Sequence, residues 1–137
     1  MSATHKTNVL NDLTLLFVDD EELIWQAIAP PLRRRFKEVY YARNGVEALE
    51  MFHRLRPAVV VTDIQMPQMD GMELVRKIRQ SAPPSLPIVV ISAYNDSEHR
   101  SDLADRHIYK PVDLHLLLDA IVDVAKHYGL VKLDRLG

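Results

Sequence analysis

Short apolar runs alternate with segments of helical periodicity along almost the whole chain, and this alternation limits the possible folds more than any other feature. The apolar runs predict strands at residues 13–18, 39–42, 58–62, 86–91 and 107–109. Apolar side chains three to five residues apart predict helices within residues 23–36, 46–56, 72–81 and 114–125. Strands that alternate with helices become parallel neighbours in one sheet, which the helices cover. The sequence therefore predicts an α/β fold built on an open, doubly wound, five-stranded parallel sheet.

Composition and charge indicate one ordinary domain. The chain has 137 residues, of which 47% are hydrophobic and 26% are charged. A formal net charge of -2 gives no broad attraction to nucleic acid or to membranes, and the basic run at residues 33–35 is interpreted as an exposed helix end. The absence of cysteine excludes disulfides and thiol chemistry. The six histidines lack the close spacing of a zinc site.

No apolar run approaches the roughly 20 residues that cross a bilayer, and the first residues are polar, unlike a signal peptide. We therefore expect a cytoplasmic protein. We also expect a polar extension at residues 1–12, the folded domain at residues 13–127, and a tail or the start of a linker at residues 128–137.

Polar residues stand where four of the five predicted strands end. Asp19 and Asp20 follow the first strand, Asp63 the third, Ser92 the fourth and Lys110 the fifth. In open α/β sheets, ligands bind beyond the carboxyl ends of the strands. We therefore expect these five residues to meet at one edge of the sheet.

Three aspartates at one edge need a cation to offset their repulsion. Carboxylates without histidine or cysteine ligands favour a hard divalent ion, and Mg²⁺ is the expected one. One aspartate can then act as a nucleophile toward a phosphoryl group, with Lys110 offsetting charge and Ser92 donating a hydrogen bond. The less specific interpretations are that Asp63 is a loop cap and that Asp19 and Asp20 stabilise a helix start.

The order and spacing of these motifs resemble the receiver domain of two-component response regulators. The matching stretches are FVDDEE (17–22), ARNGVEALE (42–50), VVTDIQMPQMDGMEL (60–74), PIVVISA (87–93) and YKP (109–111). The resemblance covers residues 13–125 and implies the flavodoxin-like (CheY-like) fold. It also implies that this is no enzyme acting on other substrates, since the chemistry is self-phosphorylation followed by slow autodephosphorylation.

The resemblance implies a role for each residue of the site. Asp63 would accept the phosphoryl group. Asp20 and Asp63 would bind Mg²⁺ directly, with the backbone carbonyl of Gln65, and Asp19 would act largely through water. Ser92 would bond a phosphoryl oxygen and Lys110 would pair with the phosphate, in a Lys110-Pro111 bond that is usually cis.

The resemblance also implies partners. The phosphodonor would be a sensor histidine kinase or a phosphotransfer protein. The output would pass to a downstream protein target or to an output domain outside this sequence, and a phosphorylation-dependent dimer is allowed. Direct binding to nucleic acid or to a membrane by this chain is not expected.

Two stretches depart from the family pattern. Pro30-Pro31 falls inside the first helix, and we expect a kink or a break near Ala29. The segment between Ser92 and Lys110 is about one turn shorter than usual, so we expect a short or degenerate fourth helix. His107 stands where the family has its switch aromatic, and Tyr109 is the other candidate for that role.

Two other functions remain open. One is an aspartyl-nucleophile phosphatase of the haloacid-dehalogenase type, but that family needs an aspartate where this chain has Gln65. The other is a pseudo-receiver that binds partners without phosphorylation, which the short segment before Lys110 keeps open.

Overall fold

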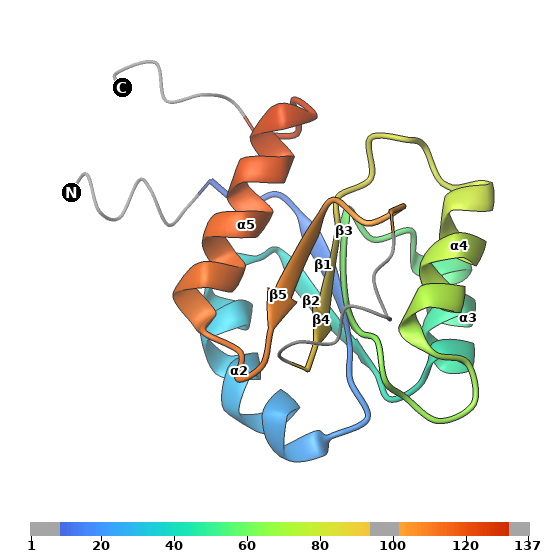
Figure 1. Ribbon diagram of the computed structural model, residues 1–137. Helices are drawn as coiled ribbons and strands as arrows, with labels where there is room; N and C mark the ends of the chain where they lie inside the picture. The colour runs from blue at the N-terminus through green and yellow to red at the C-terminus, as the bar shows by residue number, and fades with distance from the viewer. Residues whose placement is uncertain (1–8, 94–101, 132–137) are drawn as a thin grey trace.

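One sheet of five parallel strands runs through the centre of the computed structural model, which describes residues 9–93 and 102–131 (Figure 1). Along the chain the elements are β1 (Thr14–Val18), α2 (Glu22–Arg35), β2 (Glu38–Ala42), α3 (Gly45–Leu55), β3 (Val59–Asp63), α4 (Gly71–Ser81), β4 (Ile88–Ser92), β5 (Arg106–Tyr109) and α5 (Leu114–His127). The strand order is β2-β1-β3-β4-β5, and every neighbouring pair is parallel. The predicted fold class is therefore confirmed.

The sheet is covered on both faces, with α2 and α5 on one side and α3 and α4 on the other (Figure 1). Side chains alternate between the faces along each strand. On β1, for example, Leu15 and Phe17 face α2 and α5, whereas Leu16 and Val18 face α3 and α4. All residues of β3 and β4 are buried, which explains why these strands consist of nearly continuous apolar, mostly β-branched residues.

The strand order reverses direction between β1 and β3. From β1 the chain passes to β2 at one edge, and from β2 it returns to β3 on the other side of β1. Connections that leave β1 and β3 in opposite directions open a crevice between the carboxyl ends of these two strands. Asp19 and Asp63 stand at those two ends.

The break predicted near Ala29 is wrong, because α2 continues as one helix from Glu22 to Arg35 with both prolines inside it. Packing outweighs the lost proline hydrogen bonds, since Ile28, Ala29 and Leu32 are buried on the same side of the helix. The carbonyls that the prolines leave unpaired belong to residues 26 and 27, which are exposed to water. The kink stays a prediction.

The predicted fourth helix falls mainly on residues 94–101, which lie outside the described residues. The residues that follow, 102–105, form a turn that leads directly into β5. No helix is present in the described part of this connection.

Several apolar residues lie elsewhere than the helical spacing suggests. Leu23 is 79% exposed and Val46 is 52% exposed, so neither belongs to the core. Conversely, Leu10 and Val131 are buried and join the cluster under α2 and α5, although they flank the expected domain range of 13–127.

Within the described ranges, no helix has the length and apolar character that crossing a bilayer requires.

Candidate functional site

The predicted site residues stand together at the carboxyl edge of the sheet. Asp19 directly follows β1, Asp63 ends β3, Ser92 ends β4 and Lys110 directly follows β5. Asp19, Asp63 and Ser92 are 0%, 1% and 2% exposed. Ordinary packing does not favour two buried aspartates in one place, because an unpaired buried charge is costly.

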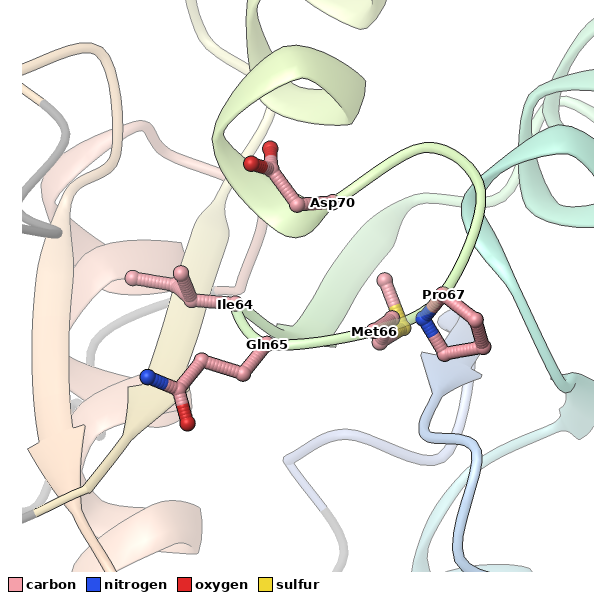
Figure 2. Close-up of a pocket in the computed structure, with 5 residues that line it drawn as sticks. All are labelled: Ile64, Gln65, Met66, Pro67 and Asp70. Atoms are coloured by element: carbon pink, nitrogen blue, oxygen red, sulfur yellow. The ribbon is translucent and has the colours of Figure 1, made fainter.

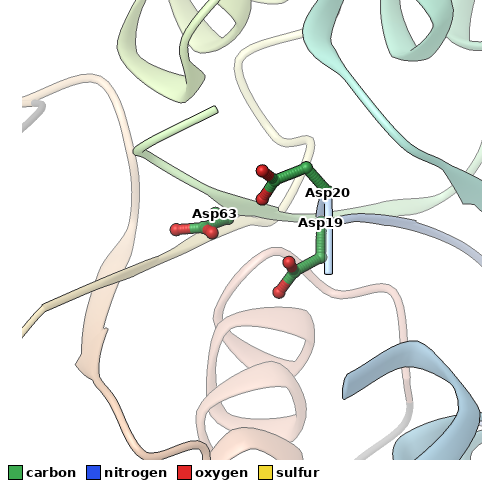
Figure 3. A group of neighbouring side chains, drawn as sticks. All are labelled: Asp19, Asp20 and Asp63. Atoms are coloured by element: carbon green, nitrogen blue, oxygen red, sulfur yellow. The ribbon is translucent and has the colours of Figure 1, made fainter. Parts of the chain in front are cut away.

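Three carboxylates converge at the crevice between β1 and β3 (Figure 3). Asp19, Asp20 and Asp63 each offer one carboxylate oxygen, and these oxygens all lie within 4.8 Å of one another. Asp20 is exposed, so the cluster opens to solvent on its side. The predicted acidic cluster is therefore present as a spatial group.

Lys110 closes the cluster on the side of β5. Its Nζ lies 3.0 Å from Oδ2 of Asp63 and 3.3 Å from Oε1 of Glu21. The backbone N–H of Lys110 donates to the carbonyl of Ser92 at 2.8 Å, which ties this residue to the end of β4. The Lys110-Pro111 bond is cis, as predicted.

Two buried carboxylate oxygens test whether this cluster suits a cation. Oδ2 of Asp19 and Oδ1 of Asp63 are buried and receive no hydrogen bond from the described residues. Their other oxygens are occupied, since Oδ1 of Asp19 accepts from the N–H of Glu21 at 2.9 Å and Oδ2 of Asp63 faces Lys110. Buried oxygens that hydrogen bonds leave unsatisfied, in a purely carboxylate set, fit a hard divalent cation.

The ionisation of the site reflects its burial. Burial raises the pKa of Asp19 to about 6, although the hydrogen bond from Glu21 opposes the shift. Burial also raises the pKa of Asp63, partly offset by the hydrogen bond and positive charge of Lys110. Burial lowers the pKa of Lys110, but the hydrogen bond and charge of Asp63 outweigh it and the net pKa is raised. Lys110 therefore stays protonated, and a bound cation would oppose the protonation of both aspartates.

The loop that follows Asp63 borders a shallow pocket, lined by Ile64, Gln65, Met66, Pro67 and Asp70 (Figure 2). Gln65 is exposed and Met66 is buried. A hydrogen bond from the Gln65 backbone is among the effects that lower the pKa of Asp63. The role of the Gln65 carbonyl as a metal ligand stays a prediction.

A glycine holds this loop close to the phosphoacceptor candidate. A Cβ added to Gly71 would lie 2.2 Å from the backbone oxygen of Asp63 and 2.7 Å from Cα of Ile64. The N–H of Gly71 also donates to the carbonyl of Ile64 at 2.8 Å. Asp70 caps α4, with its Oδ1 accepting from the N–H of Glu73 at 2.9 Å. These contacts fix the backbone that carries Asp63.

Both candidates for the switch residue lie on β5. His107 pairs with Val90 and Tyr109 pairs with Ser92, which places Tyr109 nearer to the carboxyl edge. Tyr109 is 38% exposed. The choice between them stays open.

Tyr41 on β2, which the sequence did not single out, supports the acidic cluster. The hydroxyl of Tyr41 donates to the backbone carbonyl of Asp19 at 2.7 Å. Burial and the charge of Asp19 raise the pKa of Tyr41, so this hydroxyl stays a donor. No local sequence signal reveals the contact, because it depends on the register that pairs Phe17 with Tyr41.

Comparisons with known proteins agree with this geometry. Residues 15–122 match the family model described as "Response regulator receiver domain". The chain is 33% identical over 124 residues to Response regulator RR06 of Streptococcus pneumoniae, covering 88% of this chain and 56% of that protein. It is 38% identical over 113 residues to Response regulator MprA of Mycobacterium leprae, covering 80% of this chain and 49% of that protein. The chain thus spans about half the length of these curated relatives.

A solved structure shows the same fold. The crystal structure of a response regulator receiver domain protein from Clostridium thermocellum is 27% identical to this chain, with a TM-score of 0.74. The match covers 86% of this chain and 98% of that one.

Proposed function

This chain belongs to the response regulator receiver domain family of two-component systems, and from that premise we propose that Asp63 is its phosphoacceptor. A carboxylate oxygen of Asp63 forms a bond to phosphorus while the bond from phosphorus to the donor breaks. With a phosphohistidine donor, the electron pair of the broken bond returns to the imidazole nitrogen. The product is an aspartyl phosphate.

One observation carries this proposal: Nζ of Lys110 lies 3.0 Å from Oδ2 of Asp63. Asp63 itself belongs to the group of three carboxylates that each offer an oxygen within 4.8 Å of the others. A lysine at this distance can pair with the free carboxylate before the reaction. It can then stabilise the negative charge on the transferred phosphoryl oxygens. Ser92 ends the neighbouring strand and is the proposed hydrogen-bond donor to one of those oxygens.

We further propose that Mg²⁺ is held directly by Asp20, Asp63 and the backbone carbonyl of Gln65, with Asp19 acting largely through water. When bound, the ion would offset the carboxylate charge and polarise the phosphoryl oxygens. The orphaned buried oxygens of Asp19 and Asp63 support this assignment. The charges balance, since three carboxylates face one divalent ion and one lysine.

The wider roles follow from the family and are part of the same proposal. The domain acts in the cytoplasm, where a sensor histidine kinase or a phosphotransfer protein supplies the phosphoryl group. The phosphorylated domain, taken as residues 13–127, then acts on a downstream protein target or an output domain, or dimerises. The chain catalyses its own phosphorylation and slow dephosphorylation, and the comparisons do not favour the phosphatase alternative.

The direct test is phosphorylation by acetyl phosphate in the presence of Mg²⁺, followed by intact-mass analysis. Wild-type protein should gain one phosphoryl group, and Asp63→Asn should gain none. Asp70→Asn is the matched control, because asparagine also caps helices and Asp70 stands outside the acidic cluster. Equal labelling of the wild type and Asp63→Asn, or no labelling of either, would refute the assignment.

A further inference from the structure

The main chain of Asp19 is fixed on both sides by the end of β2. Its N–H donates to the carbonyl of Ala42 at 3.1 Å, and its carbonyl accepts from the hydroxyl of Tyr41 at 2.7 Å. Since Oδ1 of Asp19 is bonded to the N–H of Glu21, only Oδ2 is left without a hydrogen bond from the described residues. Asp19 is therefore held so that one oxygen stays available.

The hydroxyl of Tyr41 is itself held by an aromatic stack. The ring of Trp25, from α2, lies parallel to that of Tyr41 with the centroids 4.6 Å apart. Trp25 also stacks on Phe17 at 5.8 Å, and the guanidinium of Arg33 lies 5.2 Å from its ring. Tyr41 thus has little freedom to move its hydroxyl away from Asp19.

We propose that Tyr41 is a positioning residue for the cation site, which sets the direction of the chain between Asp19 and Asp20. The carbonyl of Asp19 and the N–H of Asp20 belong to one planar peptide unit. A hydrogen bond that fixes the carbonyl therefore also fixes where the chain enters Asp20, whose side chain is exposed. This inference rests on the proposed magnesium site and adds to it a residue from outside the acidic cluster.

The neighbouring tyrosine offers a matched control. Tyr41→Phe removes the hydroxyl but keeps the ring that stacks on Trp25. Tyr40 precedes it on β2 and packs against the opposite face of the sheet, with the residues under α3 and α4. Tyr40→Phe therefore removes the same atom from the same strand without touching Asp19.

The experiment is a titration with Mg²⁺ followed by the backbone amide signals of residues 19 and 20 in NMR spectra, together with thermal unfolding in EDTA. Tyr41→Phe should bind Mg²⁺ roughly 3- to 10-fold more weakly than the wild type, the range expected for one lost hydrogen bond. Tyr40→Phe should bind it as the wild type does. Tyr40→Phe should also be labelled by acetyl phosphate at the wild-type rate.

The outcomes separate this inference from the proposed function. If Tyr41→Phe lowers the unfolding temperature but leaves the Mg²⁺ affinity unchanged, Tyr41 is a structural residue only and the inference is wrong. Equal weakening by Tyr40→Phe would also overturn it. If the wild type itself does not bind Mg²⁺, the proposed metal site fails first.

Discussion

At the scale of single residues, Asp19 is an acidic residue whose charged form is clearly disfavoured by burial. Its carboxylate is buried, one of its oxygens has no hydrogen-bond donor among the described residues, and burial raises its pKa to about 6. Lys110 interacts with Asp63 and Glu21. Without a bound cation, Asp19 is therefore easier to protonate in the folded protein than in the unfolded chain.

This residue predicts a dependence of stability on pH. Since the pKa of Asp19 is raised from 3.8 to about 6 on folding, the folded state binds more protons between these values and loses stability as the pH rises through them. The loss is complete above the folded pKa. Asparagine does not titrate, so Asp19→Asn should not show this loss. Between about pH 4 and pH 7, its free energy of unfolding should rise relative to that of the wild type by of order 1–3 kcal/mol.

Urea unfolding in EDTA at several pH values measures this difference. Asp12→Asn, an exposed carboxylate outside the cluster, is the control and should show no such gain. A constant difference between Asp19→Asn and the wild type at every pH would contradict the prediction.

At the scale of elements, α2 shows how packing can override local preference. The sequence pattern around Pro30 and Pro31 predicts a break, yet the helix continues because its buried residues lie on the α5 side of the sheet. The strands and the other helices were predictable, since each has a clear apolar period. Helix propensity alone was a poor guide where buried residues flank the prolines on both sides.

The helix makes Pro30→Ala a stabilising change. Pro30 is exposed, so its replacement creates no cavity, and alanine restores a backbone donor within the helix. We expect a gain of about 1 kcal/mol or more in the free energy of unfolding, because proline costs ~3 kcal/mol in a helix interior. Urea unfolding with Mg²⁺ absent gives the value. A loss of stability would show that the prolines fit this helix without cost.

At the scale of the whole molecule, the site exists because strand ends from distant parts of the chain meet. The residues at these ends could be predicted, since parallel strands place their carboxyl ends at one edge. The support from Tyr41 could not, because it requires the register between β1 and β2. The burial of Leu10 and Val131 also depends on tertiary packing and has no local signal.

A ligand that joins the ends of β1 and β3, which are distant in the sequence, should stabilise the whole fold. Mg²⁺ at about 100 times its dissociation constant should raise the free energy of unfolding by ~2.7 kcal/mol if it binds only the folded state. Asp20→Asn and Asp63→Asn should each reduce this gain, because both residues belong to the acidic cluster. Thermal unfolding with and without Mg²⁺ measures it, and an equal gain in wild type and variants would place the ion elsewhere.

β5 is the last strand of the sheet in the chain and pairs with β4 alone among the described strands, yet Lys110 directly follows it. During synthesis, a nascent polypeptide can display all three aspartates well before this ammonium group leaves the ribosome. The proposed site therefore gains the lysine that faces Asp63 only when β5 is in place beside β4. A chain that ended before β5 would keep all three aspartates but lack the ammonium group that faces Asp63.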